Sequence, residues 1–492
     1  MQTAHISKLY RSSLGLLTDL YQLTMAYGYW KANMHEREAV FHLFYRKNPF
    51  EGNFAVSAGL ALAVDYLKEL AFSPADIVYL STLKGSNGEA LFDEDFLSYL
   101  ENMSFSCDID AIPEGTIVFP HQPLVRVKGP IIQAQLIETA LLNMLNFSTL
   151  VATKAARIVQ AAEGDSVLEF GLRRAQGVDG GLTASRSSYI GGCTGTSNVL
   201  AGQLFGIPVK GTHAHSWVMG FEEELDAFET YAKAMPHNCI LLVDTYDTIE
   251  GVRNAIEVGL ALKTRGYEMI GVRLDSGDLK NLSIAARRLL DEAGLTQALI
   301  VASNDLDEYK ISALKRAGAP IDVWGVGTRL VTASDQAALG GVYKLAAIQD
   351  ENGQWQYKIK QSEDAIKISN PGLLQVVRAI DQDGFPIGDC MIDEWLENSV
   401  HEMISLSNQE EIILTANNSK KLLVPIFRNG NLVYNLPTLD AIRAHSLSQQ
   451  ALFAMIDLPK YPQGLELSLY QIKQQLLNDI NLRTNGMVSS PN

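Results

Sequence analysis

Six short apolar runs follow one another between residues 166 and 327, and they constrain the fold more than any other feature of the sequence. The runs are SVLEF, IPVKG, ILLVDT, MIGVRLDS, ALIVAS and IDVWGVG. Between the later runs lie segments with helical periodicity that each end in glycine, as helices commonly do: 248–266, 279–294 and 306–318. Successive runs are separated by about 23 to 40 residues, a spacing typical of βα units. The series predicts an α/β fold with a parallel sheet, closed into an irregular (β/α) barrel.

The regions on either side of this series have a different pattern. Before it, helical segments are mixed with strand-like segments, 39–46 and 116–129, which favours an α+β arrangement with a partly antiparallel sheet. After about residue 340 strands and turns return, and an amide-rich helical end follows. We expect an α+β N-terminal domain (1–150), a (β/α) barrel catalytic domain (151–345) and a C-terminal part (346–492). The C-terminal strands and helices are expected to pack back on the first two domains and to complete the N-terminal one.

Charge and composition exclude several functional classes. The formal net charge is −16, which argues against nucleic-acid binding, because affinity for phosphate backbones comes from clustered Lys and Arg. The four cysteines form no CxxC pair, as is usual in a reducing cytosol. The first residues, MQTAHISKLYRSS, contain no apolar signal core, and the most apolar stretch, 131–147, carries Gln133, Gln135 and Glu138. We therefore expect a cytoplasmic protein without a membrane span.

Polar side chains follow each of the six runs. In chain order these are Arg173 and Arg174; Thr212, His213 and His215; Asp244; Arg273, Asp275 and Asp278; Ser303, Asn304 and Asp305; and Gly325, Gly327, Thr328 and Arg329. In barrel folds reactive groups gather where strands end and loops begin. Loop starts are often polar for no functional reason, but this succession of complementary groups predicts a site for an anionic, phosphate-bearing ligand.

Two of these segments suit phosphates in particular. The glycines of GVGT let the backbone approach a phosphate, and Thr328 adds a hydroxyl donor. RLDSGD offers Arg273 to neutralise charge and two carboxylates, Asp275 and Asp278, that suit Mg²⁺ bound to a diphosphate. An ordinary surface ion pair is the alternative for RLDSGD. The chain has no GxxxxGK[ST] or GxGxxG motif, so the common nucleotide-binding folds are not supported.

The stretch KGTHAHSW contains two histidines with several candidate roles. Zinc needs three or four convergent ligands, and His237 and Cys239, the nearest further candidates, precede the next strand and belong at the opposite end of the sheet. A structural, hydrogen-bonded histidine is the ordinary role. However, Asp244 stands at the matching end of the next strand, and a histidine oriented by a carboxylate is the general arrangement for a base or nucleophile.

The motifs LTDLYQLTM, EFGLRRAQ, GTHAHSW, VDTYD, GVRLDSGDL and GVGTRLVT, in this order and spacing, closely resemble those of the nicotinate phosphoribosyltransferase family. The resemblance runs through at least GGVYKLA and is weaker over the last 100 or so residues. It implies an ATP-coupled enzyme of NAD salvage that joins nicotinate to phosphoribosyl pyrophosphate, releasing nicotinate mononucleotide and pyrophosphate. It also implies a phosphohistidine, Mg²⁺, a cytosolic location and a homodimer with composite active sites.

The resemblance assigns roles residue by residue. The phosphorylated histidine would be His215, the histidine of the Ala-His-Ser context, with Asp244 hydrogen-bonded to it. The nicotinate pocket would comprise Tyr21, stacked on the pyridine ring from the same or the neighbouring subunit, Phe170 on the other face, Thr212, Arg273, Arg173 and Ser197. The phosphoribosyl pyrophosphate site would comprise Thr328, Gly325, Gly327, Asp275, Ser303 and Asn304, with Asp275 as the candidate Mg²⁺ ligand. His213 receives no role from the resemblance.

Three alternatives stay open at this point. Relatives that use nicotinamide carry Asp in a Gly-Thr-Asp segment where this chain has Gly195-Thr196-Ser197, and the absence of that carboxylate favours the acid over the amide. A non-catalytic barrel that binds phosphoribosyl metabolites is disfavoured by the intact His215, Asp244, Arg273 and Asp275. A zinc hydrolase predicts stoichiometric zinc.

Overall fold

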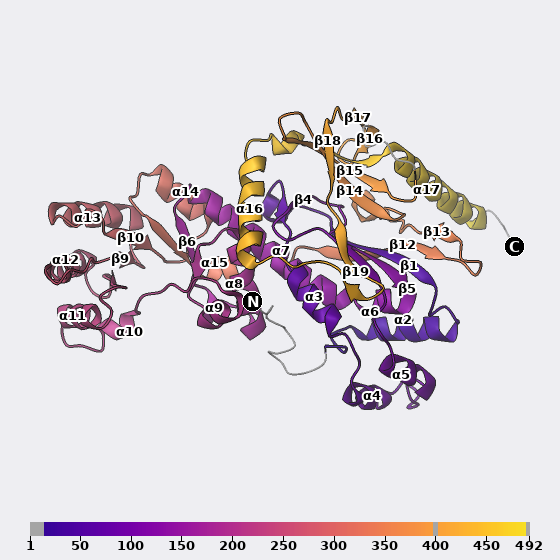
Figure 1. Cartoon of the computed structure of the whole chain (residues 1–492), viewed down its shortest axis with the longest axis horizontal. Coiled ribbons are helices and arrows are strands. Elements are labelled where there is room, and N and C mark those ends of the chain that lie inside the picture. Colours follow the sequence, from indigo (N-terminus) through magenta and orange to yellow (C-terminus); the bar gives the residue numbers. More distant parts are fainter. Residues whose placement is uncertain (1–13, 397–401, 489–492) are drawn as a thin grey trace. The chain divides into compact units, whose positions relative to one another are not determined.

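The computed structural model describes residues 14–396 and 402–488. Residues 1–13, where the sequence shows no signal core, lie outside the described residues. The chain forms two compact units, Met1–Leu150 with Ala338–Asn492, and Val151–Ala337 (Figure 1). The first unit is therefore discontinuous in sequence, and the second unit is inserted into it.

The first unit contains a seven-stranded antiparallel sheet built from both ends of the chain. Its strand order is β13 (Trp355–Tyr357), β12 (Gly341–Gln349), β1 (Glu38–Tyr45), β5 (Val125–Pro130), β3 (Asp108–Ala111), β19 (Val424–Arg428) and β20 (Asn431–Leu432). The three central strands come from the first 150 residues, and the outer strands come from beyond residue 338, so strands of different colour lie side by side in Figure 1. Later strands thus complete the N-terminal sheet, as predicted.

A second, six-stranded sheet of this unit lies wholly in the C-terminal part. Its order is β17 (Glu411–Ile413), β16 (Glu402–Ser405), β21 (Gln463–Glu466), β15 (Pro386–Asp393), β14 (Leu374–Ile380) and β18 (Asn418–Lys421), and β2 (Ala55–Val56) pairs with β4 (Ile117–Val118) separately. The helices are α2 (Leu20–Lys31), α3 (Leu60–Lys68), α4 (Pro74–Ser81), α5 (Glu94–Glu101), α6 (Ile131–Leu136), α16 (Leu439–Phe453) and α17 (Leu467–Val488). Helix α7 (Glu138–Ala161) runs from the first unit into the second.

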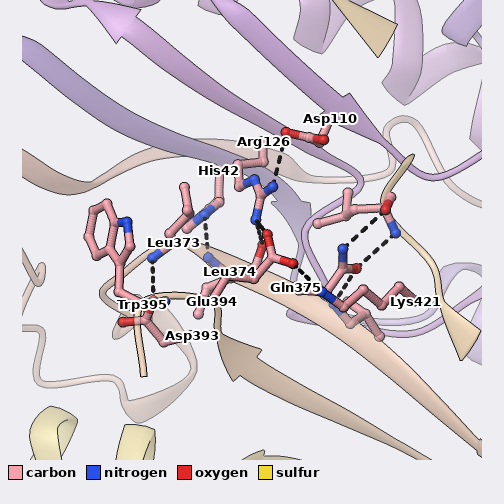
Figure 2. A network of polar contacts seen from close by, with 12 residues as sticks. His42, Asp110, Arg126, Leu373, Leu374, Gln375, Asp393, Glu394, Trp395 and Lys421 are labelled. Carbon is pink, nitrogen blue, oxygen red and sulfur yellow. Dashed lines mark hydrogen bonds and ion pairs between the residues drawn. The ribbon is translucent and has the colours of Figure 1, made fainter. Parts of the chain in front are cut away.

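A buried polar network joins β1, β3 and β5 to β14 and the residues that follow β15 (Figure 2). The Arg126 guanidinium on β5 donates to Asp110 at 3.0 Å, to Glu394 at 2.7 Å and to the Leu374 carbonyl at 2.9 Å. On β1, His42 Nε2 accepts the amide of Leu374 at 3.3 Å. These bonds engage Nη1 and Nη2 of Arg126, whereas its buried Nε has no hydrogen-bond partner among the described residues.

The helical stretch Ile131–Ala161 passes a simple length and hydropathy test for a membrane span, with a window of mean hydropathy 1.3. Two-thirds of that window, 67%, is buried inside the structure. The core helix of a globular protein passes the same test, so the stretch is weak evidence for a span.

The second unit contains the predicted parallel sheet. Its order is β7 (Gly195–Thr196), β6 (Ser166–Glu169), β11 (Val323–Val326), β10 (Leu299–Ala302), β9 (Gly271–Leu274) and β8 (Ile240–Leu242), with every pairing parallel. The first long strand, β6, pairs with the last, β11, which is the connection that a barrel requires. The helices are α8 (Gly177–Gly191), α9 (Val199–Phe205), α10 (His215–Val218), α11 (Glu224–Ala234), α12 (Thr248–Thr264), α13 (Leu279–Glu292), α14 (Glu308–Arg316) and α15 (Thr328–Val331).

The three helices predicted between the later strands have clear start and stop signals. The N-cap residues Asp247, Asp278 and Asp307 each accept a backbone amide of the first turn. Soon after each helix comes a glycine with a positive φ, namely Gly266 at 78°, Gly294 at 76° and Gly318 at 71°. Their left-handed conformation is the reason glycine stands there.

The prediction that IPVKG forms a strand was wrong in its extent. Of this run, Val209 alone makes an isolated parallel bridge, to Thr196. Pro208 has no amide hydrogen, so it contributes a carbonyl, which accepts the Thr196 amide at 3.0 Å. The short strand β7 was not predicted. Among the described residues no strand pairing joins β7 or the Val209 bridge to β8, so the sheet has an open seam between them where a closed barrel would have a ladder.

Candidate active site

A cavity of about 690 Å³ in the second unit collects the side chains that follow its strands. It is lined by predicted site residues Phe170, Arg173, Ser197, Thr212, His215, Arg273, Asp275, Ser303, Asn304, Gly325, Gly327 and Thr328, and also by Leu172, Arg174, Gly211, His213, Ala214, Leu242 and Asp305. Asp244 does not line the cavity but contacts residues that do. Tyr21 belongs to α2 of the first unit, where its side chain is 48% exposed.

Arg273 is the most extensively bonded group of the cavity. From the end of β9 it donates through Nε to Ser303 Oγ at 3.0 Å, through Nη1 to Thr212 Oγ1 at 3.3 Å and through Nη2 to Asp275 Oδ1 at 3.1 Å. Its guanidinium carbon lies 5.7 Å from the centre of the Phe170 ring. Two of the three acceptors are neutral hydroxyl groups, and the guanidinium lines the cavity, so an anion there can form charge-assisted hydrogen bonds with Arg273.

Asp244 holds the loop that follows β9. Its Oδ2 accepts the Asp275 amide at 2.8 Å and the Ser276 hydroxyl at 2.6 Å. Its Oδ1 is buried and has no hydrogen-bond partner among the described residues. This carboxylate therefore fixes the backbone at Asp275.

The expected hydrogen bond between Asp244 and His215 is not formed, and this prediction was wrong. His215 Nδ1 instead pairs with Thr245 Oγ1 at 3.1 Å, one residue further along the loop, while Nε2 lies 3.7 Å from Asp275 Oδ2. Asp244 Oδ2 is held by two donors of the loop that follows β9, and the Thr245 hydroxyl is the group that lies within hydrogen-bond distance of the His215 ring. A carboxylate does lie beside His215, as expected, but it belongs to Asp275.

Gly325 has a packing role that was not predicted. A Cβ at this position would lie 2.7 Å from the Phe170 ring, so the missing side chain makes room for that ring. The Phe170 amide donates to the Val326 carbonyl at 2.8 Å, which holds the ring over β11. Gly325 thus seats the aromatic wall beneath Arg273, a role separate from the predicted backbone approach to a phosphate.

The remaining predicted residues occupy the cavity rim. Gly327 and Thr328 begin α15, and Ser303 Oγ donates to Asp275 in a short hydrogen bond. Asn304 and Asp305 have φ angles of 99° and 49°, the left-handed region that non-glycine residues rarely adopt. Strained backbone of this kind is concentrated at functional sites. Arg173 lies in the 3-10 turn Leu172–Arg174 that follows β6, and Ser197 directly follows β7.

Glu169 is a site residue that the sequence analysis missed. This fully buried carboxylate accepts the Ser185 hydroxyl at 2.8 Å, the Thr196 hydroxyl at 2.6 Å and the Gly171 amide in a short bond. It therefore ties the turn after Phe170 to β7. A carboxylate as the last residue of an apolar strand run was the available signal.

The described residues contain no group of three or more His, Cys, Asp or Glu side chains arranged to hold a metal ion. His237 is exposed and packs edge-on against Tyr267. Cys239 is buried beside the start of β8. Asp278 caps α13 by accepting the Asn281 amide, so it is already committed to the helix. Asp275 is left as the carboxylate of RLDSGD that lines the cavity.

Comparison with known proteins bears on the whole chain. Residues 16–146 match the family model for the nicotinate phosphoribosyltransferase (NAPRTase) N-terminal domain, residues 166–369 the NAPRTase family and residues 374–455 the C-terminal domain. The chain is similar to nicotinate phosphoribosyltransferase of Bacillus subtilis, 43% identical over 96% of each chain, and to that of Homo sapiens, 39% identical over 76% of this chain and 79% of the human protein.

Among solved structures, the fold resembles human nicotinic acid phosphoribosyltransferase with a TM-score of 0.82 and 32% identity, covering 93% of this chain and 99% of the human one. The family models together span well over half of the chain. The motifs at the strand ends, the cavity that unites them and these likenesses agree: the chain belongs to the nicotinate phosphoribosyltransferase family.

Proposed function

We propose that the protein transfers the phosphoribosyl group of phosphoribosyl pyrophosphate to nicotinate, giving nicotinate mononucleotide and pyrophosphate. The observation that carries the substrate assignment is the arrangement of Arg273 and Phe170. A guanidinium with two hydroxyl partners lies 5.7 Å from an aromatic ring at one wall of the cavity. A flat aromatic carboxylate satisfies both groups, because its ring stacks on Phe170 and its charge meets Arg273.

The reaction forms a bond from the pyridine nitrogen to C1 of the ribose and breaks the bond from C1 to the pyrophosphate oxygen. Positive charge develops on the ribose as the diphosphate departs, so positioning and charge neutralisation dominate catalysis. Thr328, Gly327, Ser303 and Asn304 line the side of the cavity proposed for the ribose phosphate. Asp275 suits Mg²⁺, which commonly binds through one or two carboxylates together with substrate phosphates and water. The ion would offset the charge of the leaving diphosphate.

ATP coupling through a phosphohistidine is part of the proposal. His215 lines the cavity, and its Nδ1 is engaged by Thr245, which leaves Nε2 beside Asp275 as the nitrogen available to a phosphoryl group. With ATP as phosphoryl donor, His215 attacks the γ-phosphorus and ADP leaves. Water later releases phosphate and regenerates the imidazole.

The choice of acid over amide rests on Ser197. It lines the cavity, with its amide donating to the Glu169 carbonyl at 2.9 Å. A carboxylate at this position would repel nicotinate and accept the amide group of nicotinamide, whereas a hydroxyl does not repel the acid. We therefore propose nicotinate as the preferred base.

A cytoplasmic homodimer completes the proposal. The four cysteines are buried and form no CxxC pair, in keeping with a reducing compartment. Four apolar residues of the second unit are exposed, namely Leu172, Val178, Val199 and Val209, and exposed apolar side chains suit a subunit interface. Tyr21, also exposed, would enter the site of the second subunit.

The transfer is tested with purified protein, Mg²⁺ and phosphoribosyl pyrophosphate, by following nicotinate mononucleotide and pyrophosphate with nicotinate or nicotinamide as the base. Faster turnover of nicotinamide would overturn the substrate assignment, and no turnover of either base would favour a sensor.

Incubation with γ-labelled ATP should yield an acid-labile, base-stable label that His215→Asn removes. Mixing inactive Tyr21→Ala with inactive His215→Asn should restore part of the activity if sites are composite, and no recovery would contradict shared sites.

A further inference from the structure

His213 lies at the open seam of the second unit's sheet. The chain from Ile207 to His215 runs past β7, where the Lys210 amide donates to the Thr196 carbonyl at 2.9 Å. On its other side comes β8, whose described strand partner is β9. Among the described residues no backbone hydrogen bond crosses from this segment to β8. Side chains must therefore hold the segment against β8.

The amide of Leu242 faces this seam. Its neighbour Val243 donates to the Arg273 carbonyl, on the β9 side, at 3.2 Å. Successive amides of a strand point to opposite sides, so the Leu242 amide points away from β9. Leu242 is buried, and a buried amide without a partner is costly.

His213 satisfies that amide. Its Nε2 accepts the Leu242 N–H at 3.2 Å, and Nδ1 lies 3.4 Å from the Ala214 carbonyl. An amide can only donate, so Nε2 must be the unprotonated nitrogen and Nδ1 carries the hydrogen. The ring packs edge-on against Tyr231, 4.8 Å between ring centres, and lies 6.1 Å from Phe228. Burial lowers the pKa of His213 to about 4, which keeps the ring in the neutral form that this bond requires.

The two residues that flank this contact belong to the cavity. Thr212 accepts from Arg273 Nη1 at 3.3 Å, and His215 pairs with Thr245, which follows β8, at 3.1 Å. The His213–Leu242 bond lies between them and is the contact that joins the segment to the strand itself. A shift of the segment would move both the Thr212 hydroxyl and the His215 imidazole.

We propose that His213 is a positioning residue: its Nε2 replaces the missing strand ladder at the seam with β8 and thereby sets the places of Thr212 and His215 in the cavity. The inference deepens the proposed function and rests on it for the catalytic effect, since it concerns the same site. The role of the His213–Leu242 hydrogen bond in holding the segment against β8 does not depend on that function.

The test compares two variants that differ in the acceptor. His213→Phe keeps an aromatic ring and removes the acceptor, whereas His213→Gln removes the ring and keeps an acceptor, Oε1, at about the reach of Nε2. In His213→Phe, amide exchange in peptides covering 240–245 and 211–216 should rise roughly tenfold, as expected for one lost hydrogen bond. The KM for nicotinate should rise and kcat should fall, and His213→Gln should restore both exchange and kinetics to within a few fold of wild type.

His237→Phe is the matched control, because His237 is an exposed histidine that precedes β8, at the other end of the strand from Leu242. This variant should leave amide exchange and kinetics unchanged. The proposal would be overturned if His213→Phe exchanged its amides at the wild-type rate, or if its exchange rose while its kinetics stayed unchanged. It would also be overturned if His213→Gln restored neither exchange nor kinetics relative to His213→Phe. Exchange is measured without substrate. A wild-type protein without transferase activity would therefore refute the proposed function separately, and exchange at 211–216 would still decide the present inference.

Discussion

Arg126 in the first unit and Arg273 in the second each bind three acceptors, yet their surroundings differ in kind. The Arg126 side chain is 6% exposed and its charge is met by two carboxylates, Asp110 and Glu394. The Arg273 side chain is 15% exposed, lines a cavity, and has one carboxylate and two hydroxyl partners. The number of hydrogen bonds therefore does not separate a structural arginine from a binding one. The exposed fraction of the side chain and its access to a cavity do.

The comparison has a direct consequence for substitutions. Removing Arg126 takes the buried cation away from Asp110 and Glu394, which keep ion pairs with the more exposed Arg428 and Lys421. Removing Arg273 leaves one carboxylate, that of Asp275, which water in the cavity can reach. The first change should therefore appear in stability and the second in catalysis.

The largest effect is expected for Arg126→Met. Breaking a buried ion pair by removing one partner costs about 3–5 kcal/mol, so the free energy of unfolding measured with urea should fall by about that amount. Arg37→Met is the control, because Arg37 pairs at 3.3 Å with Glu351, an exposed side chain, and such pairs contribute about 0–1 kcal/mol. Equal losses of unfolding free energy in the two variants would contradict a structural role of the buried Arg126 pair.

Arg273→Met should lower kcat/KM for nicotinate roughly 100-fold, about 2.7 kcal/mol of transition-state stabilisation, because a charge-assisted contact is lost. Its stability should change by less than about 1 kcal/mol. Steady-state kinetics and urea unfolding of the same preparation measure both quantities. Arg329→Met, which removes a partly exposed pair with Asp305, serves as the rim control. A variant that unfolds easily but keeps its kcat/KM would make Arg273 structural, like Arg126.

Gly325→Ala sharpens the comparison at the aromatic wall. The added Cβ would meet the Phe170 ring at 2.7 Å and push it away from Arg273, and overpacking of this kind costs about 1–3 kcal/mol. We expect the KM for nicotinate to rise about tenfold, with a smaller change in that for phosphoribosyl pyrophosphate. Gly180→Ala, where a Cβ meets nothing within 4 Å, is the matched control. Equal changes in both KM values would argue against a specific role for the ring.

The last prediction concerns pH and the Arg126 network. Burial, with Arg126 nearby, lowers the pKa of His42 to about 3. At pH values between about 6.5, the pKa of an unfolded histidine, and about 3, His42 is protonated in the unfolded chain but neutral in the folded protein. The free energy of unfolding therefore falls as the pH falls through this window, by at most about 1.4 kcal/mol per pH unit. His42→Gln keeps an acceptor for the Leu374 amide and cannot be protonated. Its stability should depend less on pH between 6.5 and 4 in urea titrations, and an unchanged slope would contradict this account.

The sequence predicted the members of the cavity far better than their pairings. Strand ends in a parallel sheet meet at one edge, so position along the chain was enough to bring Arg273, Ser303 and Thr328 together. Which atoms bond depends on loop conformation at the scale of a single residue. That is why the pairing of His215 with Thr245, in place of Asp244, could not be predicted.

Two structural features escaped prediction for related reasons. The strand β7 has two residues, too few to produce an alternating pattern. The partners of Glu169 are Thr196, Ser185 and Gly171, which no periodicity connects. Strand-like segments after about residue 340, in contrast, were recognisable from the sequence. Their places in the sheet depend on contacts between residues more than 200 positions apart in the chain, such as Ala39 with Ile348.

The discontinuity of the first unit has a consequence for synthesis on the ribosome. Residues 151–337, which carry the whole cavity, emerge before β12 and β19 exist. Domains generally fold as units in the order of translation, so the inserted unit can fold while the edges of β1 and β3 still lack their neighbours. Unpaired strand edges invite association with other chains. Nascent chains halted once residue 337 has left the ribosome, with β12 still inside it, should therefore contain a folded cavity and need chaperones for the strands that preceded it.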